Sequence, residues 1–314
     1  GMKTILILGG NGFLGKNLNK VFKNSKYKIY NESRSTGCDI LNINLLSNKI
    51  RETNPDVIIN AAAHVGSITY VSKYPAQVCS DNTLMYLNIF KAIKNNNPKI
   101  LLINPISNCS YPGIIDVQHE KMWWDGIIHE SVESYGNPKK LGFVLSECYK
   151  KQFGINTVNL ILPNAYGPFD YLDEEKTHAM NGIIMRMIKA VNNNDREFLV
   201  WGSGTPIREW IYMEDAARVI KEVIERKISN IPNPLNIGQE IGVSINDSVN
   251  QIKKELKTKI EIINDLTKQD GAPIKILGSK KFQVFFPKFN FTSYEEGIKN
   301  TIKYYKELLW VKEF

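Results

Sequence analysis

The sequence lacks the long apolar run and the clustered ligands that would define several common classes of protein. None of its apolar runs approaches the roughly 18 residues that a membrane-spanning helix requires. Its four cysteines and four histidines are dispersed, without the CxxC or HExxH spacing of metal sites. The run Ile5–Leu8 is too short for a secretory signal. We therefore expect no metal, no membrane segment, no disulfide framework, and a cytoplasmic protein with reduced thiols.

Concentrated basic segments are also missing, although the net charge is +8 and the pI is about 9.1. Lysine is spread evenly and often stands beside Asn and Ile, as in Lys94–Ile100. A nucleic-acid-binding protein usually gathers Lys and Arg on one helix or face. We therefore predict no nucleic-acid partner and interpret the lysines as solvated surface groups. A modest positive field would still attract an anionic substrate such as a nucleotide diphosphate.

The first half of the chain alternates short apolar strands with helical segments. This alternation predicts an α/β fold, with a Rossmann-type doubly wound parallel sheet and helices on both faces. After Pro163 the pattern loosens without a linker rich in Gly, Ser or Pro, which favours a smaller C-terminal α/β substrate lobe packed on the first domain. We expect strands at 4–8, 27–30, 56–60, 99–103 and 157–161, and helices at 13–22, 83–94, 139–152, 179–191, 216–226, 248–257 and 292–310.

The expected domains follow from this pattern. Residues 1–163 form the dinucleotide-binding Rossmann domain, and 206–237 is expected to return to it. Residues 164–314 form mainly the substrate lobe.

Glycines cluster directly behind the first strand, in Gly9–Gly15. Their spacing satisfies both GxxGxxG and GxGxxG. One glycine makes the tight turn, the next lets the backbone approach a pyrophosphate, and the last lets helix and strand pack closely, so the phosphates lie on the helix N-terminus. The sequence thus predicts a dinucleotide site. The expected cofactor contacts are Gly9, Gly12, Phe13, Leu14, Gly15, Ser33, Arg34, Asp39, Ile40, Ala62 and Asn164.

The residues after the second strand bear on which dinucleotide is bound. A fold that prefers NAD usually places an acid where the ribose 2′-hydroxyl lies. Ser33 or Arg34 is expected at that point, and Arg34 could pair with a 2′-phosphate through its planar guanidinium. This favours NADP(H) as the cofactor. The alternative is that Glu32 is the ribose acid and Arg34 a surface charge. Asp39 and Ile40 would flank the adenine, and residues 60–63 would pass beneath the cofactor.

A second pattern, Tyr135–Lys139 with Ser107 upstream, indicates the chemistry. A ketone accepts hydride only if its oxygen is stabilised as it gains charge. Tyrosine is a weak acid with an ordinary pKa of about 10. A lysine one helical turn later would lie on the same face and lower that pKa, and Ser107 could hydrogen-bond the same oxygen. Pro138 is tolerable if it lies in the first turn of the helix. These residues predict hydride transfer between a nicotinamide and a carbonyl or alcohol.

At this point the chain resembles the extended short-chain dehydrogenase/reductase superfamily and, within it, the GDP-L-fucose synthase family. The most diagnostic segment is WGSGTPIREW, Trp201–Trp210. Further matching segments are 62–66, 107–112, 162–168 and 270–275, so the resemblance covers nearly the whole chain. It implies NADPH-dependent reduction of a GDP-bound 4-keto sugar at C4, with C3 and C5 epimerisation, in a homodimer.

The resemblance also implies residue roles. Ser107, Tyr135 and Lys139 would be the reductase triad, and Cys109 and His178 the base and acid of epimerisation. A 4-keto group acidifies the protons at C3 and C5, so one thiolate could remove both, provided that the pKa of Cys109 is lowered. Without the resemblance, Cys109 is better interpreted as a small buried residue and His178 as a capping or surface group. The positions implied to contact the GDP part are Arg186, Trp201, Arg208, Asp270 and Lys275.

Four departures from the family keep alternatives open. One lies in the catalytic motif, where 136–138 (Gly-Asn-Pro) replaces the family's small helical residues. Gly10–Asn11 stands where the family usually carries His-Arg, residues 179–182 replace an apolar residue and a proline, and 117–128 is unlike the family. One alternative is a C4-reductase alone, acting on an already epimerised GDP-4-keto hexose or heptose. A 4-epimerase or dehydratase with tightly held NAD is another enzyme option. A catalytically silent NADP-binding regulator is disfavoured, because such chains typically lose the tyrosine or the lysine.

Overall fold

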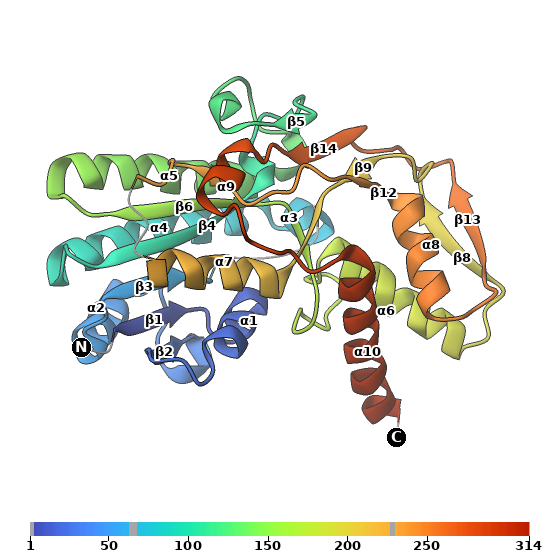
Figure 1. The fold of residues 1–314 in the computed structure, drawn as a ribbon, viewed down its shortest axis with the longest axis horizontal. Helices are drawn as coiled ribbons and strands as arrows, with labels where there is room; N and C mark the ends of the chain where they lie inside the picture. Colours follow the sequence, from blue (N-terminus) through green and yellow to red (C-terminus); the bar gives the residue numbers. More distant parts are fainter. Residues whose placement is uncertain (1–2, 63–67, 227–229, 314) are drawn as a thin grey trace.

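The computed structural model describes residues 3–62, 68–226 and 230–313 of the chain. Within them, a parallel sheet of six strands forms the centre of the first domain, in the order β11-β6-β4-β3-β1-β2 (Figure 1). This confirms the predicted Rossmann-type doubly wound fold. The strands are β1 (Thr4–Leu8), β2 (Lys28–Glu32), β3 (Val57–Asn60), β4 (Leu101–Ser107), β6 (Thr157–Leu162) and β11 (Leu235–Asn236).

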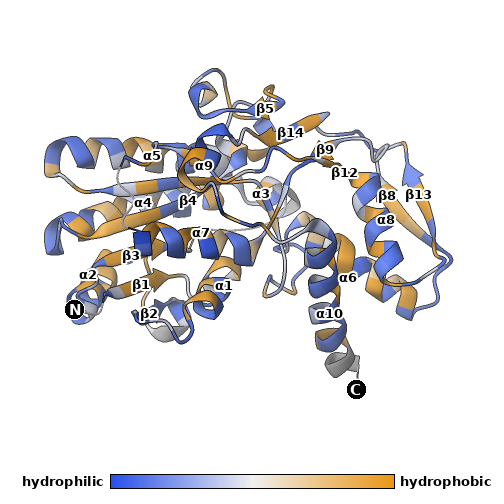
Figure 2. Cartoon of the chain, viewed as in Figure 1, coloured by the Kyte–Doolittle hydropathy of each residue, from blue (hydrophilic) through white to orange (hydrophobic). Residues whose placement is uncertain are grey.

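Helices cover both faces of this sheet because its strands are apolar on both sides. Ile5 and Ile7 of β1 face the core beneath α1 and α7, whereas Leu6 and Leu8 face the core beneath α2 and α4. Strands buried on both faces carry nearly continuous apolar runs, and Figure 2 shows the apolar colour on the strands and on the helix sides that meet them. The helices are α1 (Phe13–Phe22), α2 (Ile43–Thr53), α3 (Ile68–Lys73), α4 (Pro75–Asn96), α5 (Glu133–Phe153) and α7 (Met213–Arg226).

The strand order reverses at β1, which has β2 on one side and β3 on the other. In open α/β sheets, ligands bind at such a switch point, outside the carboxyl ends of the strands. The glycine loop follows β1, and Ser107 is the last residue of β4. The fold therefore brings two separately predicted motifs to one edge of the sheet.

The C-terminal lobe, which is the expected substrate lobe, has its own apolar core, built from α6, α8, α10 and the strands around them. Strand β5 comes from the first half of the chain but pairs with β14 in a sheet ordered β12-β9-β14-β5. From residues 206–237, α7 packs against α1, and β11 completes the central sheet. The remaining elements are β5 (Val117–Gln118), β7 (Asn164–Tyr166), α6 (Ala179–Asn192), β8 (Glu197–Trp201), β9 (Ile207–Arg208), β10 (Trp210–Tyr212), β12 (Val243–Ser244), α8 (Ile245–Glu255), β13 (Glu261–Asp265), β14 (Ile274–Leu277), α9 (Lys280–Phe285), α10 (Tyr294–Glu313) and the short helices η1 (Arg34–Thr36), η2 (Asn108–Ser110), η3 (Glu120–Met122) and η4 (Glu130–Val132).

Two element boundaries near the site differ from the sequence prediction. Helix α5 begins at Glu133, so Tyr135 lies inside it, and Pro138 falls in the second turn rather than in the first. Pro138 lacks the N–H that would bond to the carbonyl one turn earlier, while the Asn137 side chain donates to the Glu133 carbonyl at 3.0 Å. Strand β4 extends to Ser107, beyond the predicted end at 103. In the described part of the chain, no helix is both long and apolar enough to cross a bilayer.

Candidate active site

The loop Gly9–Gly15 forms a cradle that excludes side chains at its base and leaves its rim open. Gly9 has φ +78°, and a Cβ there would lie 2.6 Å from the Cα of Ala62. A Cβ at Gly15 would lie 2.2 Å from the Gly9 carbonyl oxygen, so only glycine fits where helix meets strand. At Gly12 the nearest atom would be 3.4 Å away, an ordinary contact distance. These are the separate roles that the glycine spacing predicts.

The N-terminus of α1 opens onto this cradle without a capping side chain. Gly12 is the N-cap residue, no side chain caps it, and the first turn holds no acid. The first N–H groups of a helix lack intrahelical partners and carry partial positive charge, so they bind phosphate. Phe13 and Leu14 bury their side chains and would contact a phosphate through the backbone. The cradle therefore fits the pyrophosphate of a dinucleotide.

Glu32, the alternative ribose acid, is committed to another partner. Its side chain is 5% exposed, and the Lys49 ammonium of α2 lies 2.6 Å from its Oε1. Its carbonyl oxygen accepts the Gly9 N–H at 2.7 Å. A carboxylate held in this way is buried in an ion pair with α2 rather than free for a ribose hydroxyl.

Hydroxyls and one cation occupy the surface beyond β2 instead. The Asn11 amide donates to Ser33 Oγ at 3.0 Å and to Ser35 Oγ at 2.8 Å. The Arg34 side chain is 71% exposed, with its Nε 3.6 Å from Asp39 Oδ1. Asn11, which replaces a family cation, therefore orders the serine beside Arg34.

The other predicted cofactor residues line the same edge of the sheet. The Ile40 carbonyl accepts the Asn88 amide at 2.8 Å, and the Ala62 N–H donates to Asn60 Oδ1 at 3.3 Å. Asn164 is half-buried at the start of β7. The rest of the family segment 62–66, and residue 63 of the predicted path beneath the cofactor, lie outside the described residues.

The catalytic residues predicted from the sequence meet at the end of β4. Ser107 Oγ accepts the Cys109 N–H at 3.3 Å. The Lys139 ammonium lies 4.9 Å from the ring centroid of Tyr135. Gly136 lets α5 approach this turn, because a Cβ there would lie 2.9 Å from the Cys109 carbonyl oxygen. The structure therefore brings Ser107, Cys109, Tyr135 and Lys139 together.

Burial controls the titration of this cluster. It lowers the pKa of Lys139, which is 2% exposed, to about 8. It raises the pKa of Tyr135 well above the ordinary value, and Cys109, Tyr86 and Tyr171 add in the same direction. A net lowering of the Tyr135 pKa is therefore not seen in this structure, because loss of hydration and these three neighbours raise it. A tyrosine that stays protonated suits a general acid.

The pKa of Cys109 is raised as well, chiefly by burial. The Ser107 hydroxyl and the ammonium groups of Lys275 and Lys139 act in the opposite direction without overcoming burial. The net direction is therefore opposite to the lowered pKa that a thiolate base requires. In the described residues, no group of three His, Cys, Asp or Glu side chains is placed to hold a metal.

Two cations of the substrate lobe face this cluster. Lys275 of β14 pairs in register with Arg208 of β9, and Lys275 interacts electrostatically with Cys109. Arg208 Nη1 donates to the Ala272 carbonyl at 2.7 Å. Burial and the Arg208 charge lower the pKa of Lys275. Neither cation is ion-paired with an acid in the described ranges, so together they offer a binding site for an anion such as a diphosphate.

The remaining predicted substrate residues have local partners. Asp270 accepts the Ser203 N–H at 2.8 Å and its hydroxyl at 2.6 Å, which fixes the loop after β8. Trp201 is 69% exposed, with the Lys268 ammonium 5.2 Å from its ring centroid. The Arg186 guanidinium lies 5.7 Å from the ring of Phe198. Contact of Asp270, Trp201 and Arg186 with a nucleotide stays a prediction.

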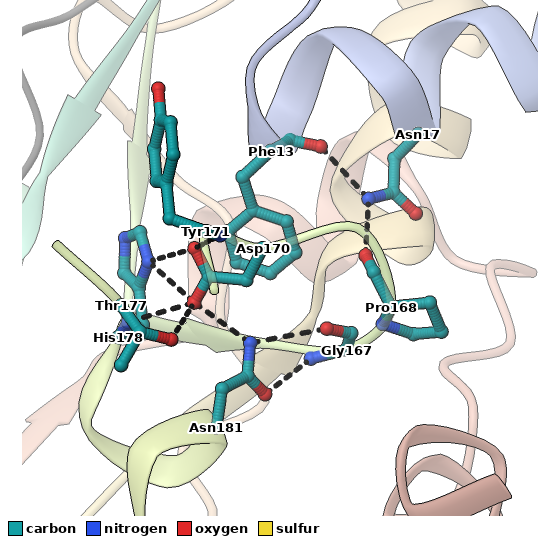
Figure 3. A network of polar contacts seen from close by, with 9 residues as sticks. All are labelled: Phe13, Asn17, Gly167, Pro168, Asp170, Tyr171, Thr177, His178 and Asn181. Carbon is teal, nitrogen blue, oxygen red and sulfur yellow. Dashed lines mark hydrogen bonds and ion pairs between the residues drawn. The ribbon is translucent and has the colours of Figure 1, made fainter. Parts of the chain in front are cut away.

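His178 lies at the start of α6 and contacts the cofactor helix. Its ring is 5.0 Å from that of Phe13, and its Nδ1 is 3.1 Å from both carboxylate oxygens of Asp170 (Figure 3). It is neither an isolated surface group nor a side-chain cap. Among the described residues, no hydrogen bond joins it to Cys109. Asp170 was not predicted as a site residue. The only feature of the sequence that could indicate it is the presence of an acid eight residues before His178.

Two further polar groups near the cluster were also missed. The Tyr86 hydroxyl of α4 is fully buried, has no hydrogen-bond partner in the described structure, and interacts electrostatically with Cys109 and Tyr135. The side-chain amide of Gln118 on β5 is also buried and has no hydrogen-bond partner in the described structure. No sequence signal marks them, since a tyrosine within an amphipathic helix is typical of a core.

Comparison with known proteins agrees with this fold and site. The chain belongs to the NAD dependent epimerase/dehydratase family, whose model matches residues 5–238. This confirms the resemblance to extended short-chain dehydrogenases/reductases. A GDP-L-fucose synthase from Dictyostelium discoideum is 26% identical over 306 residues, covering 96% of this chain and 95% of that protein. A GDP-L-colitose synthase from Yersinia pseudotuberculosis is 28% identical over 303 residues, covering 96% and 97%.

Two solved structures share the fold over almost the whole chain. A GDP-L-fucose synthetase from Naegleria fowleri bound to NADP has a TM-score of 0.86 and 24% identity, covering 98% of this chain and 95% of that chain. A GDP-6-OMe-4-keto-L-xylo-heptose reductase from C. jejuni has a TM-score of 0.85 and 19% identity, covering 98% of both chains. At these identities the likeness supports the fold.

Proposed function

We propose that this chain reduces a GDP-bound 4-keto sugar at C4 with NADPH, in the synthesis of a nucleotide sugar. The observation that carries the proposal is the convergence of Ser107, Tyr135 and Lys139 beside an open phosphate cradle. The names of the relatives from Dictyostelium discoideum and Yersinia pseudotuberculosis supply the substrate class.

The chain's own groups complete the reduction. When bound, NADPH supplies a hydride to the carbonyl carbon. Tyr135 donates its proton to the carbonyl oxygen, and the Ser107 hydroxyl hydrogen-bonds the same oxygen, so the developing negative charge is neutralised where it forms. The Lys139 ammonium, 4.9 Å from the Tyr135 ring centroid, stabilises the tyrosinate that remains.

The anionic part of the substrate fits the two cations of the substrate lobe. Arg208 and Lys275 lie side by side on β9 and β14. A diphosphate between them would offset a like-charge repulsion that the free protein retains. Since Lys275 also interacts with Cys109, the diphosphate would lie next to the reacting sugar. We extend this proposal to Arg186, Trp201 and Asp270 as contacts to the nucleoside.

The preference for NADPH over NADH rests on the residues after β2. Glu32 is held by Lys49, whereas Arg34 is exposed and Ser33 is ordered by Asn11. A planar guanidinium matches a 2′-phosphate, and a free acid there would repel it. We propose that Arg34 and Ser33 contact the 2′-phosphate.

The proposal includes epimerisation at C3 and C5, because the chain keeps both Cys109 and His178. One thiolate could remove either proton, and an imidazolium could return one from the other face. The second candidate is a C4-reductase alone, acting on a sugar already epimerised elsewhere. The raised pKa of the Cys109 thiol favours that candidate, since a protonated thiol is no base.

We also propose a homodimer in the cytoplasm. Helices α4 and α5 pack side by side, and Leu84 and Leu141 on them are 41% and 39% exposed. Exposed leucines on adjacent helices suit a helical interface. All four cysteines are free thiols, which fits a reducing compartment.

The test follows NADPH absorbance with GDP-4-keto-6-deoxymannose made in situ, and identifies the product by NMR. GDP-L-fucose as product would establish both activities. A sugar reduced at C4 with C3 and C5 unchanged would establish the reductase alone. No oxidation of NADPH with this sugar or with a GDP-4-keto heptose would refute the proposal.

A further inference from the structure

Asp170 is a buried carboxylate that gathers donors from both ends of one loop. Its side chain is 0% exposed. It accepts the Tyr171 N–H at 2.8 Å, the Thr177 hydroxyl at 3.0 Å and the Asn181 amide at 2.9 Å. It also accepts the backbone N–H of His178 at 2.7 Å. Figure 3 shows these bonds converging on the carboxylate between β7 and α6.

This carboxylate dictates which nitrogen of His178 carries a proton. Nδ1 lies 3.1 Å from both Asp170 oxygens. Although burial acts to raise it, the pKa of Asp170 is held below the ordinary value by the charge of the nearby His178 and by hydrogen bonds from His178 and Asn181. A carboxylate accepts and cannot donate, so the contact requires Nδ1–H. Nε2 has no partner among the described residues and is left for another group.

The surroundings place this pair at the junction of cofactor and substrate. The His178 ring packs against Phe13, the first residue of the cofactor helix. The Tyr171 hydroxyl, next in the chain after Asp170, would be 3.5 Å from a Cβ at Gly12, and Tyr171 interacts electrostatically with Tyr135. The loop therefore reaches both the phosphate cradle and the catalytic tyrosine.

The backbone immediately before Asp170 adds an independent observation. Phe169 has φ +78°, a left-handed conformation that is rare for a bulky residue. Such strained residues persist where surrounding contacts over-determine them, and they concentrate at functional sites. Asn181 ties the same loop down by bonding to both backbone groups of Gly167 at 3.1 Å. The fold thus maintains a strained loop whose central group is the Asp170 carboxylate.

We propose that Asp170 is a positioning residue that keeps the His178 proton on Nδ1, so that Nε2–H is the group that protonates the sugar. This inference rests on the proposed epimerisation. Cys109 in its thiolate form takes a proton from C3 or C5 of the keto sugar and becomes the neutral thiol, and the electron pair is delocalised onto the C4 oxygen. The imidazolium then gives its Nε2 proton to that carbon from the opposite face. The ring is left neutral, with Nδ1–H still bonded to Asp170.

The first test is a ring-nitrogen NMR spectrum of the full chain with 15N-labelled histidine. The chain has four histidines, and His178→Gln assigns the signal by its loss. At a pH at which the His178 ring is neutral, we expect the Nδ1–H tautomer in the wild type. In Asp170→Asn we expect a shift toward the Nε2–H tautomer. An Nε2–H tautomer in the wild type would overturn the proposal, whether or not the variant folds.

The second test separates positioning from mere stability. Asp170→Asn should lower incorporation of solvent deuterium at C3 or C5 by ~10²-fold or more, as expected when a general acid is misplaced. Reduction of an already epimerised GDP-4-keto sugar should be unchanged. The matched control is Asp215→Asn, which alters another buried carboxylate, bonded to Arg218 of α7 and to Thr292, just before α10. This control should lower the melting temperature and leave deuterium exchange unchanged.

The outcomes distinguish this inference from the proposed function. If the wild type does not oxidise NADPH with any GDP-4-keto sugar that is tested, the proposed function is refuted. A wild type that reduces the sugar but exchanges no deuterium refutes the role of His178, and leaves the reductase. Asp170→Asn with full exchange, or Asp215→Asn with an equal loss of exchange, overturns the role of Asp170.

Discussion

The hydroxyl of Tyr86 offers a test in which deleting an atom should stabilise the protein. Tyr86 is 0% exposed, and its hydroxyl has no hydrogen-bond partner in the described residues. Its ring lies against α5, where a Cβ at Gly142 would be 2.8 Å from the ring. Tyr86→Phe keeps the ring in this packing and removes only the unpartnered oxygen. We therefore expect a higher free energy of unfolding.

The size of the effect follows from two opposing contributions. A buried hydroxyl left without a partner costs about 1–3 kcal/mol. Removing the oxygen leaves a void of roughly 10 Å³, which costs only about 0.2 kcal/mol at about 24 cal/mol per Å³. The net stabilisation is about 1 kcal/mol or more, which corresponds to about 2 °C in melting temperature for a chain of this size.

The assay is urea unfolding followed by circular dichroism, with the melting temperature measured alongside. Tyr111→Phe is the matched control, because the buried Tyr111 hydroxyl donates to Asn236 Oδ1 at 2.6 Å. Losing a satisfied bond should destabilise by about 1–2 kcal/mol. A Tyr86→Phe variant destabilised as much as Tyr111→Phe would refute the reasoning, since it would show that the Tyr86 hydroxyl is bonded.

Further predictions concern the cofactor and the catalytic lysine. Gly15→Ala should abolish NADPH binding and lower the melting temperature, because its Cβ would lie 2.2 Å from a carbonyl oxygen. Gly12→Ala should keep the melting temperature and only weaken NADPH binding. Fluorescence titration measures the binding of both variants. Arg34→Ala should raise the dissociation constant of NADPH ~10-fold, about one charge-assisted hydrogen bond, and leave that of NADH unchanged; equal weakening of both would contradict the 2′-phosphate contact. Burial lowers the pKa of Lys139 to about 8. As the pH rises through that value the ammonium is lost, so the reduction rate should fall. In the unfolded chain Lys139 keeps its higher ordinary pKa, so between the two pKa values the unfolded state binds more protons. The contribution of Lys139 to the free energy of unfolding should therefore rise with pH across that window. Lys139→Met should remove the pH dependence of the reduction rate, measured as kcat, and that of stability, measured by urea unfolding.

The parts of the site that depend on local spacing could be predicted from the sequence. Gly9, Gly12 and Gly15 act within one turn of the chain, and the structure gives each its expected space. Tyr135 and Lys139 lie one helical turn apart, so their proximity needs only the helix. The alternation of strands and helices was enough to predict a parallel sheet covered by helices, because parallel strands require crossovers.

The parts that depend on long-range packing could not be predicted. The ion pair of Lys49 with Glu32 joins α2 to β2 and removes the alternative ribose acid. The pKa values of Tyr135 and Cys109 depend on burial, which sequence spacing does not measure. Asp170 lies near His178 in sequence, but the residue before it, Phe169, has a left-handed conformation that its residue type does not predict.

The segment 117–128, which is unlike the family, explains how the substrate lobe reaches the catalytic cluster. Its Trp123 is 2% exposed and packs edge-on against Tyr111 and Phe143, at centroid distances of 5.0 and 5.8 Å. This anchors the segment to α5 and to the end of β4.

The same segment carries β5, where Gln118 pairs in register with Leu277 of β14. Paired residues of a parallel ladder share a face, and alternate residues return to it, so Gln118 lies on the face of the sheet that carries Lys275. The anchor therefore places β14 so that the Lys275 charge acts on Cys109. A change of sequence in 117–128 can then alter the proposed sugar site by moving Lys275 and the buried Gln118 amide. Ser107, Tyr135 and Lys139 would stay in place on β4 and α5.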